Sequence, residues 1–448
     1  MKTKSLLSLL VMAVVLCFNS CKKETVDVTR LLESVPSSAA GVVVFNVESL
    51  LGDAGCKVKG HEIQPGEEIR ELLKNATSER QQEMMALFNG ESGIEPKGAV
   101  IFYDSNRSYL TFALSDVKKF CDFFEKKFDA SFSDESGVKV LNNIAVKGAQ
   151  AWICLSQGKR LDPDAIASYS SLASSQSFLV SQMGQKLLVQ ENDIRGWALI
   201  STFTNEMLTR SERSMVTLGL GFLFEGAESV EFKVDFEKGE MESEIKVLND
   251  KGKPAKYLLP SEKVDVSTLK TLGTTCDALM AFTVNPKLIK KFQQIGEAFG
   301  GALFGDLGEM FKNIDGTVGI ISGGQGMGES ISGVLTTKGT VSQTILDLIS
   351  GQIAPVSQDG KYLRFNKGDV KGGLNVADCA EDLDDCCLGL VFDATGYNSV
   401  GYGTKAPGGF RDLALKFKPE SGGLELEINL HTLNTDENAL LTFLKDMK

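Results

Sequence analysis

The chain has 448 residues, of which 42% are hydrophobic, and a formal net charge of −12 at pH 7. This length accommodates two or three domains with hydrophobic cores of their own. The acidic balance excludes most nucleic-acid binders, because phosphate backbones are bound by concentrated Lys and Arg, and the sequence has no such patch.

The first residues have the pattern of an export signal. Lys2 and Lys4 form a short basic start, and an apolar run follows over residues 6–18. This run is shorter than the roughly 20 residues that an α-helix needs to cross a bilayer. A basic start, a short apolar stretch and a small residue at the exit therefore predict a secretory signal.

The end of this signal resembles a bacterial lipobox. Ser20, a small residue, stands directly before Cys21, although Phe18 is larger than the aliphatic residue usual at its position. We predict a lipoprotein signal peptide over 1–20, lipid (palmitate) attachment at Cys21 and a polar tether over 21–28. The alternative is ordinary secretion, in which Cys21 is a plain thiol.

A Pro-Ala turn, a Val-rich strand and the start of a Ser-Leu-Leu helix follow the tether. This stretch resembles the opening of a family of Bacteroidota lipoproteins that is defined only as a domain of unknown function. The matching residues are Pro36, Ala39, Val42, Val43, Val44, Asn46, Ser49, Leu50 and Leu51. The resemblance implies an envelope lipoprotein without an assigned activity.

The residues after Cys21 bear on which side of the membrane the protein faces. In lipoproteins of this kind, an acidic run after the lipid cysteine often accompanies export to the cell surface. Lys22 and Lys23 occupy that place here. We therefore predict an outer-membrane anchor that faces the periplasm, with surface exposure as the alternative.

The pattern of the rest of the chain predicts two related halves, 29–262 and 263–448. Residues 40–51 resemble residues 277–288, with Phe45 aligned to Phe282. Each half then repeats a helix, a hairpin, a second helix and an amphipathic hairpin. The expected elements are, in the first half, 67–88, 98–114, 116–128 and 229–249, and in the second half, 286–304, 316–337, 341–349 and 412–431.

The two amphipathic hairpins show strict alternation of apolar and polar residues. In 412–431 the apolar set is Leu413, Leu415, Phe417, Leu424, Leu426, Ile428 and Leu430. Such a period of two predicts one sheet face on a core and the other in water. Long antiparallel hairpins beside helices, without regular βαβ alternation, predict an α+β fold with an internal duplication.

Nine cysteines occur, and an odd number is left once Cys17 and Cys21 are assigned to the signal and the lipid. The cysteines in apolar segments, Cys121, Cys154 and Cys276, are expected to be buried thiols. Cys379 and the adjacent pair Cys386 and Cys387 lie in an acidic stretch, where the group could hold a disulfide. No CxxC occurs, so neither a zinc ribbon nor thioredoxin chemistry is indicated.

Only two histidines are available as general bases, His61 and His431. His61 lies in a Gly- and Pro-containing loop near Cys56, where a Cys–His nucleophile pair is conceivable, but a loop without chemistry is the simpler interpretation. His431 ends an alternating strand and is expected to be exposed. We assign neither residue a catalytic role.

Four further stretches resemble functional motifs without completing one. Ser115 begins an S-x-x-K pattern that lacks its partners, and we interpret it as a helix N-cap. The glycines of 323–328 lack the Lys-Ser/Thr of a phosphate loop and predict a hairpin turn. The carboxylates of 378–387 lack the EF-hand spacing and predict a solvated acidic loop. The Ser-rich stretch 167–182 predicts a polar helix or loop.

The sequence thus predicts a lipid-anchored envelope protein, non-catalytic, with a binding or structural role. The expected partners are the membrane, through the lipid, and an envelope protein or glycan. No metal, cofactor or catalytic residue is predicted. The alternative is an envelope hydrolase that acts on glycans or peptides with paired carboxylates, although the sequence does not single out a pair.

Overall fold

The computed structural model describes residues 28–446, except 76–77, 157, 203–222, 258, 260, 285–313, 325–329, 342, 353, 396–408 and 421. The predicted signal, Cys21 and the predicted helix 286–304 lie outside these residues. No helix in the described part is both long and apolar enough to cross a membrane.

The chain divides into two compact units. The first comprises Met1–Arg213, Glu228–Met241 and Asn434–Lys448, and the second comprises Ser214–Ala227 and Glu242–Leu433. The division therefore differs from a single boundary at residue 262. Strand β13 (Glu240–Leu248) pairs with β24 (Gly423–Thr432) of the second unit, while the terminal helix α17 (Ala439–Asp446) packs on α3 and α4 of the first.

The first unit is built on an antiparallel sheet with β1 (Gly41–Phe45) in its interior. On one side of β1 lie β10 (Ile194–Leu199) and then β12 (Ser229–Phe236). On the other side follow, in order, β4 (Ile94–Asp104), β5 (Arg107–Leu114), β9 (Gln150–Cys154), β8 (Ile144–Lys147), β7 (Val138–Leu141) and β6 (Ser133–Glu135). A short hairpin, β2 (Lys57–Lys59) with β3 (Glu62–Gln64), lies outside this sheet.

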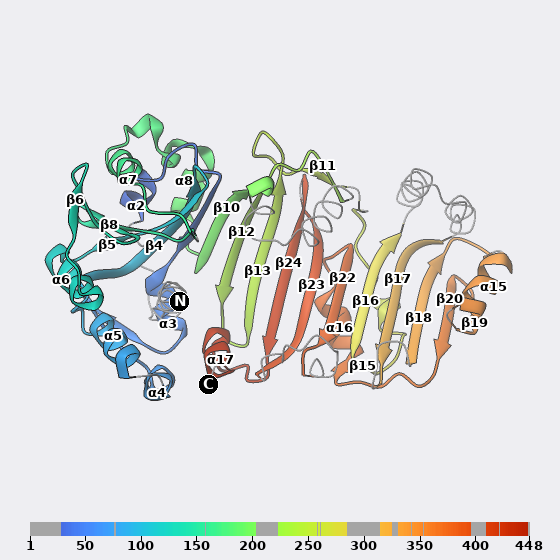
Figure 1. Ribbon diagram of the computed structural model, residues 1–448. Helices are drawn as coiled ribbons and strands as arrows, with labels where there is room; N and C mark the ends of the chain where they lie inside the picture. Colours follow the sequence, from blue (N-terminus) through green and yellow to red (C-terminus); the bar gives the residue numbers. More distant parts are fainter. Residues whose placement is uncertain are drawn as a thin grey trace. The chain divides into compact units, whose positions relative to one another are not determined.

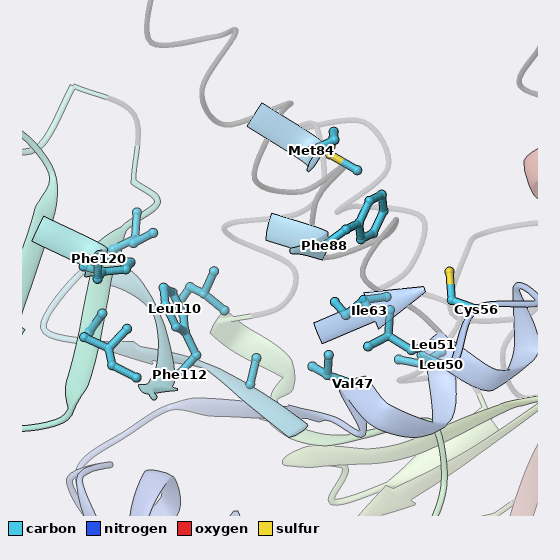
Figure 2. Close-up of a cluster of buried hydrophobic side chains, with 14 of the residues drawn as sticks. Val47, Leu50, Leu51, Cys56, Ile63, Met84, Phe88, Leu110, Phe112 and Phe120 are labelled. Atoms are coloured by element: carbon cyan, nitrogen blue, oxygen red, sulfur yellow. The ribbon is translucent and has the colours of Figure 1, made fainter. Parts of the chain in front are cut away.

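Side chains of this sheet alternate between two hydrophobic cores, as the period of two requires. Ala99, Leu110 and Phe112 point into one core with residues of α3 (Val47–Asp53), α4 (Glu67–Asn75), α5 (Ser78–Phe88) and α6 (Val117–Phe128), and Figure 2 shows part of this cluster. Val100 and Tyr109 belong to the other core, with residues of α2 (Thr29–Glu33), α7 (Pro163–Tyr169) and α8 (Gln182–Val189). Short 3-10 turns lie at Ser174–Gln176 and Phe178–Val180.

The second unit also has an antiparallel sheet, with β16 (Ala278–Val284) in its interior (Figure 1). On one side of β16 follow β17 (Ile314–Gly323), β18 (Ser330–Thr337), β20 (Tyr362–Lys367) and β19 (Val356–Asp359). On the other side follow β22 (Leu388–Asp393), β23 (Phe410–Glu420), β24 and β13. Two short pairs, β11 (Phe224–Glu225) with β14 (Lys256–Tyr257) and β15 (Thr275–Cys276) with β21 (Leu374–Asn375), complete its strands.

The helices of the second unit pack beside this sheet. Residues of α11 (Val266–Leu269) and α16 (Val376–Asp382) share one core with β16 and β22, and α15 (Gln343–Gln352) packs against β19. Helices and large antiparallel sheets therefore occur together in the described residues, and the α+β prediction is confirmed at that level.

Most predicted elements are present, with local corrections. The predicted helix 67–88 is two helices, α4 and α5. Hairpin 98–114 turns at Ser105 and Asn106, which both have positive φ. The N-cap prediction for Ser115 is wrong, because Asp116 caps α6: its Oδ1 accepts from the backbone N–H of Lys118 at 2.9 Å and of Lys119 at 3.0 Å.

The hairpin of β23 and β24 reverses our expectation about its faces. The more deeply buried face carries Asp412, Lys416, Glu425, Glu427 and Asn429, each at most 9% exposed. Leu413, Leu415, Phe417, Leu426, Ile428 and Leu430, which we expected to face a core, are only half-buried. Burial of the charges is tolerated because opposite charges pair, as Lys246 does with Glu425 at 2.5 Å.

Candidate functional site

His61, one of the two histidines considered as a base, belongs to an exposed ion pair. It lies in the turn between β2 and β3, its side chain is 56% exposed, and its Nδ1 is 3.0 Å from Oε2 of Glu95. Cys56 is buried in the core shown in Figure 2, beside Leu51 and Ile63. His61 thus has a carboxylate neighbour, and Cys56 takes part in the packing of a hydrophobic core.

The prediction that His431 is an exposed residue is wrong. Its side chain is 15% exposed, and its Nδ1 lies 2.5 Å from Oδ1 of Asp412, the residue opposite it on β23. Asp382, at the end of α16, joins these two, and the ligand atoms of the three residues lie within 4.8 Å of one another. Among the described residues this is the group whose geometry could hold a metal ion.

The bonds within this cluster indicate an ion-pair network. Both oxygens of Asp412 are engaged, since His431 occupies Oδ1 and Nε of Arg411 donates to Oδ2 at 2.5 Å. Burial raises the pKa of Asp412, but the hydrogen bonds from His431 and Arg411 outweigh it and leave this pKa lowered. Burial raises the pKa of Asp382. A metal ion at this cluster would compete with His431 and Arg411 for Asp412.

The prediction that 378–387 is a loop is wrong for residues 378–382, which belong to helix α16, whereas 383–387 form the turn between α16 and β22. Asn375 caps this helix, and its Oδ1 accepts from the backbone N–H of Ala377 at 2.8 Å. The carboxylates do not converge on one point: Glu381 pairs with Lys270, and Asp385 lies 2.6 Å from Nζ of Lys418. The carboxylates are thus divided between helix α16 and the turn after it.

The Ser-rich stretch 167–182 spans the end of α7, two 3-10 turns and the start of α8, in agreement with a polar helical or loop segment. Ser177 and Ser181 act as caps: their hydroxyl oxygens accept from the backbone N–H of Leu179 at 3.1 Å and of Gly184 at 2.9 Å. The glycines at 323–324 end β17, and the rest of the predicted turn lies outside the described residues.

A second carboxylate cluster, which sequence reasoning missed, lies in the first unit. Asp53 ends α3, Asp193 precedes β10 and Asp235 lies in β12. The side chains of Asp53 and Asp193 are hydrogen-bonded to one another, and Nδ2 of Asn438 donates to Oδ1 of Asp53 at 2.9 Å. Burial, together with the negative charge of Asp193, raises the pKa of Asp53 to about 8. The pair therefore holds a proton at neutral pH.

Asp235 and a buried arginine complete the surroundings of this acid pair. Oδ1 of Asp235 accepts from the backbone N–H of Asp193 at 3.2 Å, and its Oδ2 accepts from Asn192 at 2.5 Å. Arg195 is 2% exposed and donates to the carbonyl oxygen of Leu187 at 2.5 Å. Burial lowers the pKa of Arg195 to about 10, and the nearby Asp235 opposes that change.

The second unit contains a groove of about 550 Å³ at the ends of β16, β17 and β18. Three threonines line it, one from each strand: Thr283, Thr317 and Thr336. The register places Thr283 directly opposite Thr317, and the hydroxyl of Thr336 donates to the carbonyl oxygen of Thr317 at 3.1 Å. Thr283 and Thr317 are buried in this wall, and Thr336 is half-buried.

Charged residues of both signs form the rest of the groove. Glu262, Lys263 and Asp265 lie on the segment before α11, and Asp315 and Lys338 form an ion pair at the ends of β17 and β18. The backbone N–H of Asp265 donates to Oγ1 of Thr317 at 2.7 Å, which ties this segment to the sheet. The groove therefore offers carboxylate and ammonium groups to one ligand, beside the half-buried side chain of Thr336.

Thr283 differs from its neighbour Thr317 in hydrogen bonding. Thr283 is 3% exposed, and its Oγ1 has no hydrogen-bond partner in the described part of the chain. A buried hydroxyl without a partner destabilises the folded state by about 1–3 kcal/mol. The sequence could not distinguish Thr283 from Thr317, because each is a single Thr within an apolar strand.

These two threonines give a matched pair of stability predictions. We expect Thr283→Val to raise the free energy of unfolding by about 1 kcal/mol, because it replaces an unsatisfied hydroxyl with a methyl of equal size. We expect Thr317→Val to lower it by about 1–2 kcal/mol, because the N–H of Asp265 loses its acceptor. Urea unfolding of both variants measures the difference, and equal effects would contradict the assignment.

The comparisons with known proteins identify no family. No protein-family model matches the chain, and no curated protein matches it. Among solved structures, crystal form I of TP0453 aligns with a TM-score of 0.29 and 9% identity, over 78% of this chain and 95% of that chain. Crystal form III of TP0453 aligns with a TM-score of 0.30 and 10% identity, over 78% and 96%. Similarity at this level supports no inference about fold or function.

Proposed function

We propose that this chain is a non-catalytic, lipid-anchored envelope protein that binds a small hydroxyl-rich ligand, such as a glycan fragment. The observation that carries the proposal is the polar groove at the ends of β16, β17 and β18 in the second unit. Its volume lies within the roughly 300–1,000 Å³ of known ligand pockets.

The chemistry of the groove favours a ligand with many hydroxyl groups. Exposed carboxylates and ammonium groups line it, from Glu262, Lys263, Asp265 and Lys338, and a ligand hydroxyl can both donate to a carboxylate and accept from an ammonium group. Asp315 and Lys338 neutralise each other, so the groove has no excess of one charge at that end. A strongly anionic or cationic ligand would find a repulsive partner beside each attractive one.

The anchor and the location come from the sequence. Lipid at Cys21 would hold the protein in the outer membrane, facing the periplasm, and the likeness of Pro36–Leu51 to Bacteroidota lipoproteins agrees with such a place. The tether over 21–28 would keep the folded units near the membrane, because each extended residue spans only about 3.5 Å.

We also propose that the two units arose by duplication. In each unit one strand, β1 or β16, lies in the interior of the sheet, the next hairpin pairs on one side of it, and later strands return to the other side. Thus β1, β4, β5 and β9 occupy the same sequence of places as β16, β17, β18 and β20. This agreement in strand order supports the duplication.

No observation favours the hydrolase alternative. Paired carboxylates of glycosidases stand about 5–9.5 Å apart with space for a sugar or water between them. Asp53 and Asp193 instead hydrogen-bond to each other, and Asp412 is held by His431 and Arg411. Both clusters therefore have the contacts of structural networks.

The groove is tested by titrating the purified full chain with soluble mono- and disaccharides, including amino sugars, and following binding by calorimetry. We expect Lys338→Met to weaken binding by about 10-fold or more, the equivalent of one charge-assisted hydrogen bond. Lys367→Met, an exposed lysine on β20 outside the groove, is the matched control. Equal binding by both variants, or no binding of any sugar by the native chain, would remove the proposal.

The anchor has a separate test in cells. We expect Cys21→Ser to move the protein from the membrane fraction to the soluble periplasmic fraction, and mass spectrometry of the native N-terminus to show the acyl chains. Protease treatment of intact cells should leave the native protein intact until lysis. Digestion before lysis would place the protein on the cell surface. An N-terminus without lipid would mean that the signal serves only for secretion.

A further inference from the structure

Two buried cysteines of the second unit lie together although a long stretch of chain separates them. Cys276 is the last residue of β15, and the register of β15 with β21 places it opposite Leu374. Helix α16 begins directly after β21, so Cys379 lies one turn inside the helix. The two cysteines are 0% and 3% exposed and belong to the same hydrophobic core.

The backbone holds both residues in place. The N–H of Val376, the first residue of α16, donates to the carbonyl oxygen of Thr274 at 3.1 Å, which ties the helix start to the segment that carries Cys276. Gly372 lies so close that a Cβ built on it would be 2.0 Å from the carbonyl carbon of Cys276. Neither cysteine can move away without breaking this packing.

The two thiols are neighbours in this core: the interaction with Cys379 lowers the pKa of Cys276, and the interaction with Cys276, together with burial, raises the pKa of Cys379. The neighbouring thiol of Cys386 is directed elsewhere and donates to the carbonyl oxygen of Leu383 at 3.2 Å. Cys387 follows directly, in the short segment between α16 and β22. The sequence suggested a disulfide within the group Cys379, Cys386 and Cys387. The geometry instead favours Cys276 as the partner of Cys379.

We propose that Cys276 and Cys379 form an intrachain disulfide when the chain folds in the presence of a disulfide oxidant. The bond would join β15 to α16 within one core. The proposal is independent of the groove and its ligand, because it requires only these two thiols and the oxidant.

The step balances as a thiol–disulfide exchange. The Cys276 thiolate attacks the oxidant's disulfide and releases one thiol of the oxidant. Cys379 then attacks the mixed disulfide and releases the second, so two electrons and the two protons of the cysteines leave with the oxidant. Since both sulfurs are buried in the folded unit, exchange precedes completion of the core.

The bond would close a loop of about 100 residues, a length at which a cross-link strongly restricts the unfolded chain. The loop contains β16, β17, β18, β19 and β20, which form one side of the sheet. The cross-link would therefore stabilise the whole second unit, including the groove wall.

The test refolds the purified full chain with oxidised glutathione or with reduced glutathione, and then alkylates it under denaturing conditions. We expect the oxidised sample to show two fewer alkylated cysteines and a cross-linked peptide that contains Cys276 and Cys379. We expect its Tm to exceed that of the reduced sample by on the order of 10 °C.

Variants identify the pair independently. Cys276→Ala with Cys379→Ala should abolish the difference in Tm between the two samples, and the matched control Cys386→Ala should keep it. Full alkylation of the oxidised native chain, or a cross-link from Cys379 to Cys386 or Cys387, would overturn the proposal. Because the mass measurement uses the native chain, the result does not depend on the variants folding.

Discussion

Replacing Asp53 with Asn is expected to raise the free energy of unfolding at pH 8 by about 2–3 kcal/mol and to leave it unchanged near pH 4. The pKa of Asp53 is raised from 3.8 to about 8 by burial and by the neighbouring charge of Asp193. A pKa difference of one between the folded and unfolded states corresponds to about 1.4 kcal/mol. Because Asp53 is only half-buried, solvent screening reduces the total by about half.

The sign of this effect follows from where the proton is held. Between pH 4 and 8 the folded state keeps a proton on Asp53 that the unfolded state has lost, so stability falls as pH rises through this window. Below it both states are protonated and the group contributes nothing. The amide introduced by Asp53→Asn cannot ionise, yet it can donate to Asp193 and accept from Asn438, as the protonated acid does.

The measurement is a set of urea unfolding curves of both proteins at pH 4, 6 and 8. Asp122→Asn, an exposed residue on α6, is the matched control and should leave the pH dependence as it is in the native chain. The pKa of Asp193 also depends on its hydrogen bond with Asp53, so the difference between the two proteins reports the acid pair as a unit. Parallel pH curves for the native chain and Asp53→Asn would refute a shared proton at this site.

Local patterns of the sequence predicted elements that depend on few neighbours. The hairpins 98–114 and 316–337 and the strand at 277–284 were recognisable because hydrophobic periodicity and turn residues lie within the segment itself. The same patterns could not reveal Asp53 beside Asp193, or Thr283 beside Thr317. These pairs are made by the order and register of strands far apart in the chain, which periodicity does not encode.

The hairpin of β23 and β24 shows a second reason why a sequence pattern can mispredict the structure. Alternation in β23 and β24 correctly predicted two chemically different faces, but the prediction that the apolar face is the more deeply buried one was wrong. A lysine opposite a glutamate, as Lys416 is to Glu427, neutralises both charges and permits burial. The pattern of polar residues alone is the same for a solvated face and for a buried, paired one.

This buried pairing gives the second large expected effect. Glu427 is 3% exposed and is ion-paired with Lys416, directly opposite it, and with Lys418 at 2.5 Å. We expect Glu427→Ala to lower the free energy of unfolding by about 3–5 kcal/mol, because it leaves the buried ammonium of Lys416 without its carboxylate. Burial raises the pKa of Glu427, but the bonds from both lysines outweigh it and lower that pKa, so its contribution should disappear as pH falls below about 4.

The double change Lys416→Met with Glu427→Leu separates the loss of a partner from the loss of a charge pair. It removes both buried charges at once and fills their space with apolar groups, so we expect a cost of only about 1–2 kcal/mol, smaller than that of Glu427→Ala alone. Lys418 keeps Asp385 at 2.6 Å in the double variant and remains paired. Chemical denaturation of the native chain, of Lys416→Met, of Glu427→Leu and of the double variant gives the coupling energy of the pair. A loss below about 1 kcal/mol for Glu427→Ala would place the pair among ordinary surface ion pairs, and additive single losses would show that the two side chains act independently.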